Sequence, residues 1–394
     1  MFSDKLEILL LFCATNHYRM KKVLLVIAFL APALLFAQKP VPKSYDLIVG
    51  SYTKGTAQGI SVYRFYTESG RMAYLSQTVS SNASYLCLSS NNKYIYAVNE
   101  DGKDGGVSSF SFEPKNGILT AINKQSSGGA DPCYISVDKE QRNAFVANYS
   151  SGSLTVLPIN KDGSLGAVVQ KIQDSGKGAN AERQEGPHVH TAFFSPDEKY
   201  LFYNDLGTDK MGHTRYKPSE KQPLVPITDE DVKFAPGSGP RHMDFTPDKK
   251  YVYVITELSA SVTAFEYHGG KMKQIQSITM LAPGFKGTSG AADIHVSPDG
   301  RFVYASNRGD ANDIIQYAVD QNTGKLIYVD RVSSQGKGPR NFVIDPTGKF
   351  LLVANQNSDS IIVYKRDLES GKLKLTGNRM TVSNPVCLKF APAM

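Results

Sequence analysis

A repeat that is cut between the two ends of the chain limits the possible folds more than any other feature. Each copy reads as a short strand, a turn and a second strand, as in Met243–Phe245, Thr246–Lys250 and Tyr251–Ile255. Proline and aspartate in the turn favour its tight bend. The residue that starts the second strand recurs every 48–57 residues, at Tyr94, Asn143, Tyr200, Tyr251, Phe302 and Phe350. Repeats of this length with several strands each are typical of β-propellers.

The seventh copy is divided between the two termini. Asp46–Ser51 matches a second strand that has no first strand before it, and Asn384–Pro392 matches a first strand with no successor. The two halves make one repeat only if a ring closes, and closure also removes exposed sheet edges. Each strand pair is followed by an alternating strand such as Ser261–Tyr267 and an outer strand such as Met272–Met280. The sequence therefore predicts an all-β fold, a seven-bladed β-propeller with four-stranded blades over residues 45–394, closed by pairing of its N- and C-terminal strands.

One repeat departs from this plan. The stretch Gly207–Gly239 is long, rich in Lys, Pro and Asp, and shows no clean third strand. Two interpretations stay open: a loop that extends over the mouth of the ring, or a degenerate outer strand pair.

The first 37 residues read as an upstream extension followed by a signal peptide. Met1–Arg19 form the extension, and Met20–Lys22, Val23–Phe36 and Ala37 supply the basic, apolar and small-residue parts of a secretory signal. The apolar run is short for a membrane span, although a single N-terminal anchor is the alternative. We expect a periplasmic or secreted protein that begins near residue 38, with residues 38–44 as a linker and no stable membrane span after signal removal.

Charge and cysteine content argue against several classes of partner. The net charge of +7 is mild, and Lys and Arg are scattered through turns, which indicates a solvated surface rather than a nucleic-acid footprint. Cys13 would leave with the signal, and Cys87, Cys133 and Cys387 lie in the first strands of different repeats. An odd number without CxxC spacing predicts buried free thiols rather than a disulfide framework or a metal site.

Two positions of the repeat lie where the strand pairs end, so their side chains should ring one mouth of the disk. The first ring consists of Ser84, Cys133, His190, Arg241, Ala292, Arg340 and Val386. The second ring consists of Glu100, Tyr149, Leu206, Glu257, Arg308 and Gln356. The start of one antiparallel strand lies beside the end of its partner, so Arg241 and His242 should meet Glu257.

Functional groups gather in four consecutive repeats, on one side of this mouth. They are His188, His190, Asp205, Arg241, His242, Glu257, Asp293, His295, Arg308, Arg340 and Asn341. Arginines suit an anionic small molecule because the planar guanidinium binds carboxylate or phosphate in two places. A histidine or glutamate beside them can move protons near neutral pH. The pattern predicts a site for an anionic small molecule.

Structural interpretations of the same residues stay open. Arg241 and Glu257 could form an ion pair that only stabilises the fold, Asp205 and Asp293 could hold turns, and His295 could be a hydrogen-bonded core histidine. His188 and His190 could supply two zinc ligands, but no set of partners completes a coordination shell. The sequence also shows no GxSxG, HExxH, P-loop or dinucleotide motif. We therefore predict neither a metal nor a cofactor.

Four motifs carry a resemblance to a known family. They are GPHVH, GPRHMDFTPDKKYVYVITEL, DIHVSPDGRFVYASNRG and GPRNFVIDPTGKFLLVANQ. They are similar to the lactonase family of seven-bladed propellers, which includes propeller-type 6-phosphogluconolactonase and carboxymuconate lactonising enzyme. The resemblance spans about Tyr45–Pro392. It implies a metal-independent carboxylic ester hydrolase whose catalytic histidine, arginines and glutamate match His190, Arg241, Arg308 and Glu257.

The neighbouring residues are expected to bind the substrate. They are His188, His242, His295, Arg340 and Asn341. The resemblance implies a small anionic or sugar lactone as substrate, phosphorylated or not. The alternative is a non-catalytic exported propeller that binds an anionic ligand or a protein on the same face. Either His188 or His190 could be the functional histidine.

Overall fold

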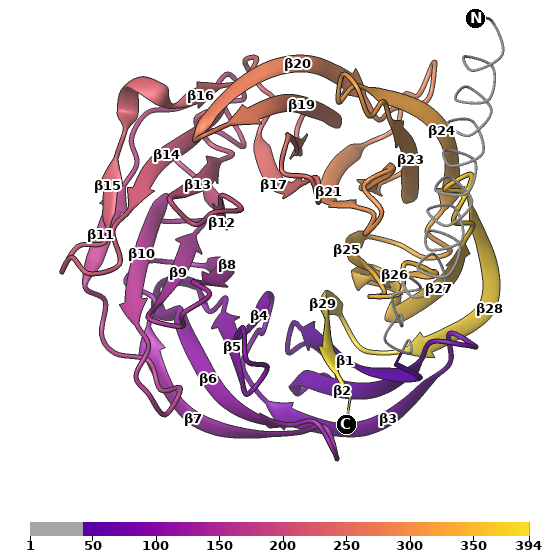
Figure 1. Ribbon diagram of the computed structural model, residues 1–394, viewed down its shortest axis with the longest axis horizontal. Helices are drawn as coiled ribbons and strands as arrows, with labels where there is room; N and C mark the ends of the chain where they lie inside the picture. Colours follow the sequence, from indigo (N-terminus) through magenta and orange to yellow (C-terminus); the bar gives the residue numbers. More distant parts are fainter. Residues whose placement is uncertain (1–41, 394) are drawn as a thin grey trace, which may run out of the picture. The chain divides into compact units, whose positions relative to one another are not determined.

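Seven antiparallel sheets stand around a central axis in the computed structural model, which describes residues 42–393 (Figure 1). In each sheet the strand pair of the repeat lies innermost, and the third and fourth strands follow outward. Successive side chains of a strand point to opposite faces, so each blade buries apolar side chains against both of its neighbours. Tyr253, Tyr304 and Phe342 are fully buried examples.

The strands keep the order of the repeat around the whole ring. The inner strands are β4 (Leu86–Leu88), β8 (Pro132–Val137), β12 (Val189–Phe194), β17 (Pro240–Phe245), β21 (Ser289–Val296), β25 (Pro339–Ile344) and β29 (Pro385–Pro392). The second strands are β5 (Tyr94–Asn99), β9 (Asn143–Asn148), β13 (Tyr200–Asp205), β18 (Tyr251–Thr256), β22 (Phe302–Gly309), β26 (Phe350–Asn355) and β1 (Ser44–Ser51). The third strands are β6 (Gly106–Glu113), β10 (Ser153–Pro158), β14 (Lys210–Tyr216), β19 (Ser261–His268), β23 (Asp313–Val319), β27 (Ser360–Arg366) and β2 (Gly59–Tyr66). The outer strands are β7 (Ile118–Ser126), β11 (Gln170–Gln173), β15 (Leu224–Pro226), β20 (Lys271–Thr279), β24 (Leu326–Ser333), β28 (Leu373–Thr381) and β3 (Met72–Val79). Short 3-10 turns stand at Gly102–Asp104, Thr228–Glu230 and Gln356–Ser358.

The ring is closed by the two ends of the chain, as the divided repeat predicts. β29 pairs with β1 in antiparallel register, from Tyr45 opposite Pro392 to Ser51 opposite Pro385. In Figure 1 the yellow β29 lies beside the indigo β1. The predicted seven-bladed propeller with terminal closure is therefore confirmed.

The irregular stretch Gly207–Gly239 completes the blade that β12 begins. β14 supplies its third strand, β15 pairs with one end of β14, and a further strand, β16 (Val232–Lys233), pairs with the other end. The Asp209 carboxylate accepts hydrogen bonds from the backbone N–H groups of Gly237 and Gly239, both at 2.7 Å. Of the two interpretations, the structure supports the degenerate outer strand pair rather than a loop over the mouth.

Six of the seven inner strands in the described chain carry a β-bulge near their first residues. A bulge inserts residues that have no partner on the neighbouring strand and re-aims their side chains. In β12, Val189 pairs with Asp205 and Thr191 with Asn204, so the pairing skips His190. The skipped residues are Cys133, His190, Arg241, His242, Ala292, Asp293, Arg340 and Val386. The bulges therefore place most of the first predicted ring at one mouth.

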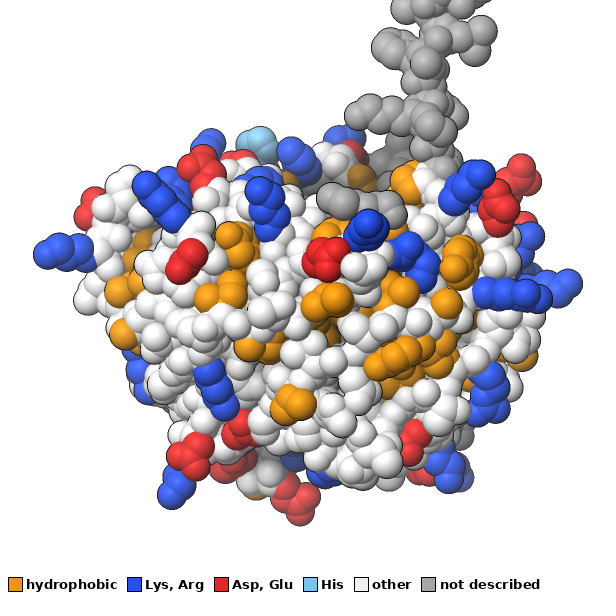
Figure 2. Space-filling model, turned by 90° about the horizontal axis from the view of Figure 1, so that it is seen from below, with side chains coloured by type: hydrophobic (Ala, Val, Ile, Leu, Met, Phe, Trp, Pro, Cys, Tyr) orange, Lys and Arg blue, Asp and Glu red, His pale blue; other side chains and the backbone are white. Residues whose placement is uncertain are grey.

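The rim of the disk carries mixed charge. Figure 2 shows Lys and Arg side chains interspersed with Asp and Glu on this face, rather than gathered by sign.

Cys87, Cys133 and Cys387 are free thiols, of which Cys87 is only half-buried. No helix within residues 42–393 is long and apolar enough to cross a membrane. The predicted extension, signal peptide and most of the linker lie outside the described residues, and these domain boundaries stay predictions.

Deleting residues 385–394 is expected to abolish cooperative folding. The deletion removes the buried Val386, Cys387 and Leu388 and leaves one edge of β1 unpaired. Each buried aliphatic side chain contributes roughly 1.5–3 kcal/mol, against a total stability of about 5–15 kcal/mol. Thermal unfolding followed by circular dichroism should show no cooperative transition, whereas a protein that lacks only Ala393 and Met394 should melt normally. A truncated protein that melts within a few degrees of the full chain would show that terminal closure is dispensable.

Candidate functional site

A cavity of about 520 Å³ opens at the mouth of the ring where the bulges lie. Its lining combines both predicted rings with a few further residues. It consists of Glu100, Cys133, Tyr149, Arg183, His190, Glu257, Ser289, Gly290, Arg308, Gly309, Arg340, Gln356 and Asn357. The two rings read from the sequence therefore supply most of this cavity.

Three arginines converge on Glu257, which directly follows β18. Arg241 Nε and Arg308 Nη2 each lie 2.9 Å from Glu257 Oε2, and Arg183 Nη2 lies 2.7 Å from Oε1. Burial alone would raise the pKa of Glu257, but Arg308, Arg241 and Arg183 outweigh it and hold that pKa well below its ordinary value. Both carboxylate oxygens are already engaged, so Glu257 is a poor acceptor for a further proton.

Arg241 is fully buried and fixed from several sides. Its guanidinium donates to the carbonyl of Ala292 and to His242 Nε2, the latter at 3.2 Å. Its carbonyl oxygen accepts from Thr191 Oγ1 and, at 3.0 Å, from Asn204 Nδ2. Burial, followed by the charges of the neighbouring arginines, lowers the pKa of Arg241 to about 10. Arg241 is therefore a charged support behind Glu257 rather than part of the cavity surface.

His190 faces the cavity as a neutral imidazole. Within residues 42–393 its buried Nδ1 has no hydrogen-bond partner, and its ring meets the edges of Tyr149 and His242 at 5.7 and 5.2 Å between centroids. Burial, then the charges of Arg241, His242 and Arg340, lower the pKa of His190 well below its ordinary value. His190 is therefore unprotonated at neutral pH, and its side chain lines the cavity.

His188 lies behind the cavity wall. Its Nδ1 lies 3.2 Å from the carbonyl oxygen of Tyr149, and its ring stacks on the Tyr149 ring at 4.4 Å. Its Nε2 lies 3.2 Å from Glu185. Of the two histidines in the GPHVH motif, only His190 lines the cavity.

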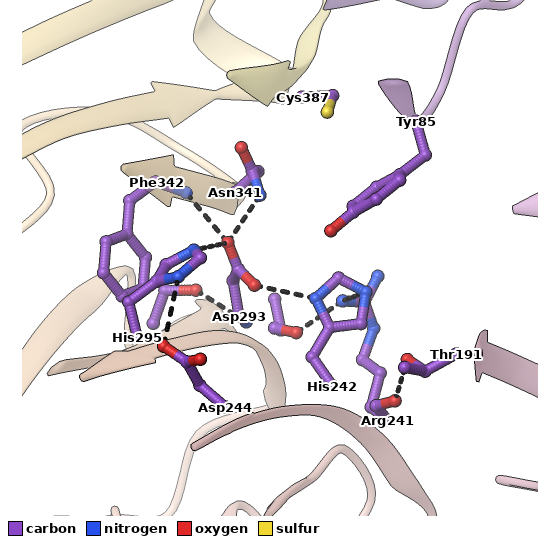
Figure 3. Close-up of polar contacts among 12 residues, drawn as sticks. Tyr85, Thr191, Arg241, His242, Asp244, Asp293, His295, Asn341, Phe342 and Cys387 are labelled. Atoms are coloured by element: carbon purple, nitrogen blue, oxygen red, sulfur yellow. Dashed lines mark hydrogen bonds and ion pairs between the residues drawn. The ribbon is translucent and has the colours of Figure 1, made fainter. Parts of the chain in front are cut away.

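Asp293 gathers three of the predicted substrate ligands in the channel below the cavity (Figure 3). Asp293 Oδ1 lies 2.7 Å from His242 Nδ1, and Oδ2 contacts His295 Nε2 at 3.1 Å and the Asn341 amide. The backbone N–H of Phe342 also donates to Oδ2, at 3.2 Å. None of His242, His295 and Asn341 lines the cavity, so direct substrate binding by these three residues stays a prediction.

The Asp293 cluster fixes the groups above it. His242 Nε2 accepts a hydrogen bond from Arg241, so the proton of its ring resides on Nδ1 and is donated to Asp293. Burial and the charge of Arg241 lower the pKa of His242 to about 4, which keeps it neutral. Burial opposes the charge on His295, but Asp293 and Asp244 raise its pKa to about 9. A chain of contacts therefore runs from Asp293 through His242 and Arg241 to Glu257.

Arg340 forms a second charged group on another side of the cavity. Its Nη2 lies 4.0 Å from Glu100 Oε2, and its guanidinium stands 5.4 Å from the ring centre of Tyr52. The Tyr52 hydroxyl donates to Glu100 Oε2 at 2.8 Å. Counting Arg241 behind the wall, four guanidiniums face two carboxylates, Glu100 and Glu257. This excess of positive charge suits an anionic ligand or a developing oxyanion.

The sequence reasoning missed Arg183. It lies between β11 and β12, outside the repeated strands, and its only signal is its position just before the GPHVH motif. Its side chain is 46% exposed and also contacts the Tyr149 hydroxyl at 3.3 Å. The adjoining Gln184 is buried and anchors the segment by donating to the Leu206 carbonyl and to Asp209, both at 2.8 Å. The backbone at Arg183 is thus anchored by the neighbouring Gln184, while the Arg183 guanidinium reaches the cavity.

No group of three or more His, Cys, Asp or Glu side chains in residues 42–393 is placed to hold a metal ion.

Asp205 fixes the turn at the end of β13. Its Oδ1 accepts hydrogen bonds from the backbone N–H groups of His188 and Gly207, at 2.7 and 2.9 Å. Burial and the neighbouring Asp174 carboxyl raise the pKa of Asp205 to about 7. The folded state therefore holds this proton up to about pH 7, whereas the unfolded chain releases it near pH 4.

Replacing Asp205 by asparagine is expected to change how stability depends on pH. Between about pH 4 and 7 the folded state binds more protons at Asp205, so the contribution of this residue to the free energy of unfolding falls as pH rises. The slope is at most about 1.4 kcal/mol per pH unit. Urea unfolding between about pH 5 and 8 should show that wild type loses stability relative to Asp205→Asn, with the difference constant above about pH 7. A difference that grows in favour of wild type with pH would contradict this assignment.

Comparisons with known proteins agree with the fold. The family model described as Lactonase, 7-bladed beta-propeller, matches residues 46–390. The chain belongs to this family. The resemblance read from the four motifs is thereby confirmed.

Relatives of this lactonase-family propeller match it over nearly their whole length. The 6-phosphogluconolactonase of Bacillus subtilis strain 168 is 39% identical over 87% of this chain and 97% of that protein. The 6-phosphogluconolactonase of Formosa agariphila is 36% identical over 87% of this chain and 99% of that protein. The solved structure of the periplasmic gluconolactonase of Pseudomonas aeruginosa has a TM-score of 0.86 and 40% identity, and the match covers 89% of this chain and 100% of that one.

Proposed function

We propose that this chain hydrolyses a sugar lactone in the cavity lined by His190 and Glu257. The observation that carries the proposal is the pairing of a neutral imidazole with a surplus of guanidiniums in one cavity. Both elements promote lactone hydrolysis, since a base can take a proton from the attacking water and positive groups can stabilise the oxyanion. The relatives are named 6-phosphogluconolactonase and gluconolactonase, and these names support the same chemistry.

In the proposed reaction a water molecule attacks the carbonyl carbon of the lactone while His190 accepts its proton. The carbonyl oxygen becomes an oxyanion, which the guanidiniums of Arg308 and Arg340 stabilise. The bond between the carbonyl carbon and the ring oxygen then breaks, and the His190 imidazolium returns its proton to that oxygen. The product is an open-chain hydroxy acid, which ionises in water, and the enzyme returns to its starting state.

Glu257 has a different role in this proposal. The sequence left Glu257 and His190 as alternative bases, and the three arginines on Glu257 favour His190. Glu257 orients Arg241 and Arg308 and compensates their charge, so it acts as a positioning residue. Arg308 also donates to the Gly290 carbonyl at 2.9 Å, which keeps its guanidinium directed at the cavity.

We further propose that the protein is exported and that its substrate is a lactone outside the cytoplasm. The basic and apolar segment at Met20–Phe36 motivates this, and the periplasmic gluconolactonase relative supports it. N-terminal sequencing of the protein from cells should give a start near Gln38. A chain that begins at Met1 in the cytoplasm would contradict export.

A lactone panel tests the proposed activity. Acid release should be followed in a pH-stat with D-glucono-1,5-lactone, its 6-phosphate and a simple aliphatic lactone, after subtraction of spontaneous opening. We expect both sugar lactones to be hydrolysed faster than the aliphatic one. If no lactone is hydrolysed above the spontaneous rate but the protein binds them, the non-catalytic alternative replaces this proposal.

Replacing Arg183 by alanine is expected to weaken selection for an acidic substrate. Of the three arginines that contact Glu257, Arg183 has the most exposed side chain. Its guanidinium can therefore reorient toward a phosphate or carboxylate on the lactone. A charge-assisted hydrogen bond contributes about 1.5–3 kcal/mol, or roughly 10–100-fold. The ratio of kcat/KM for the phosphorylated to the unphosphorylated lactone should therefore fall by about tenfold or more, mainly through KM. Arg215→Ala, at an exposed arginine on β14, is the control. An equal loss for both lactones would exclude a role in selectivity.

A further inference from the structure

A second cavity, of about 340 Å³, is lined by the opposite ends of several inner strands. Its lining includes Phe194 at the end of β12, whereas His190 near the start of β12 lines the active-site cavity. Four residues of strand span roughly 13 Å. The two cavities therefore lie toward opposite faces of the disk.

Aromatic rings separate the two cavities. Tyr85 and Tyr134 stack at 4.1 Å, and their rings meet the edge of His242 at 5.7 and 5.5 Å. Figure 3 shows Tyr85 and His242 approaching one another across the channel. Tyr85, Tyr134, Phe193 and Phe194 give the second cavity largely apolar walls.

The second cavity contains one cation that forms no close ion pair, Lys389, on which Asp293 acts only from beyond 4.0 Å. Lys389 Nζ lies 3.1 Å from the Tyr85 hydroxyl and 4.4 Å from the centre of the Tyr85 ring. No carboxylate of the described chain lies within 4.0 Å of this ammonium group. Glu198 is the one carboxylate in the lining of the cavity, and it already accepts from the backbone N–H of Lys139 at 3.1 Å.

The other charged groups at this end of the channel pair with each other. His295 contacts Asp293 at 3.1 Å and Asp244 at 3.8 Å. Asp244 also accepts from the backbone N–H of Val296 at 2.8 Å. Of the two described charged residues that line this cavity, Glu198 pairs with Lys139, whereas Lys389 forms no ion pair within 4.0 Å.

We infer that this cavity binds a small monocarboxylate with a flat or aliphatic apolar body. A single ammonium group matches one carboxylate, and the tyrosine and phenylalanine walls match an apolar body. A volume of about 340 Å³ lies at the small end of ligand pockets and suits a molecule of the size of benzoate. A sugar acid fits poorly, because apolar walls would leave its hydroxyl groups without partners. The ligand therefore differs in class from the proposed substrate and product.

Benzoate is the probe, and calorimetric titration of the full protein measures its binding. Benzyl alcohol, which has the same ring without the charge, should bind wild type at least tenfold more weakly. Lys389→Met should weaken benzoate binding by about 10–100-fold, the range of a charge-assisted hydrogen bond. Lys389→Arg, which retains the charge, should bind benzoate within about fivefold of wild type.

Arg308→Met separates this cavity from the active site, whose arginines also attract anions. Benzoate binding should stay within twofold of wild type in Arg308→Met. The inference is overturned if wild type shows no benzoate binding at 10 mM. It is also overturned if binding is lost in Arg308→Met but retained in Lys389→Met. Neither result depends on whether the protein hydrolyses a lactone.

Discussion

Replacing His190 by alanine is expected to lower kcat for lactone hydrolysis by about 10²–10⁴-fold, the usual range for loss of a general base. His190 is the histidine that lines the cavity, and its neutral ring is free of protein hydrogen bonds at Nδ1 within the described residues. Because the loss concerns proton transfer, KM should change little. Steady-state rates after subtraction of spontaneous opening measure this effect.

His188→Ala is the matched control. His188 stacks on Tyr149 behind the cavity wall, so its removal should cost less than about tenfold. The pH profile gives a second reading: because the pKa of His190 lies well below its ordinary value, kcat/KM should stay level from neutral pH to below about pH 6.5 and fall only at lower pH. The assignment fails if His190→Ala stays within twofold of wild type while His188→Ala loses the activity.

Replacing Glu257 by alanine is expected to destabilise the fold by about 3–5 kcal/mol, the usual effect of removing one partner from a buried ion pair. Arg241 is 1% exposed, and it would lose the carboxylate that compensates its charge. Arg308 and Arg183 would then repel it without an anion between them. Urea unfolding at neutral pH measures the change in the free energy of unfolding.

Glu257→Gln separates charge from shape. It keeps a hydrogen-bond acceptor for the guanidiniums but removes the negative charge, so its destabilisation should fall between wild type and Glu257→Ala. If Glu257→Ala is within about 1 kcal/mol of wild type, the three arginines do not depend on this carboxylate. Glu257 would then be free to act as a base, contrary to the role proposed for it.

The periodic part of this protein could be predicted from its sequence. The spacing of the strand pairs fixes the number of blades, and the divided repeat requires terminal closure. The same period aligns His190, Arg241 and Arg340 in one ring and Glu257 and Arg308 in the other. Positions that recur once per blade share one height in a propeller, so the sequence identifies most of the residues that line the cavity.

Features without periodicity could not be predicted in this way. Arg183 lies in a connection that has no counterpart in the other repeats. The bulge in β17 places both Arg241 and His242 inside the ring, whereas regular alternation would send neighbouring side chains to opposite faces. For the same reason His242 and Asn341 meet Asp293 below the cavity instead of lining it. How deep a side chain lies along the central channel depends on backbone geometry, which the pattern of residue types does not specify.

The most direct test of catalysis in this cavity compares wild type with the double variant His190→Ala/Arg308→Ala on D-glucono-1,5-lactone. Acid release is measured at neutral pH with equal protein concentrations, and circular dichroism confirms that both proteins melt cooperatively. We predict that wild type exceeds the spontaneous rate and that the folded double variant does not. A double variant that retains the rate of wild type would contradict hydrolysis at this site.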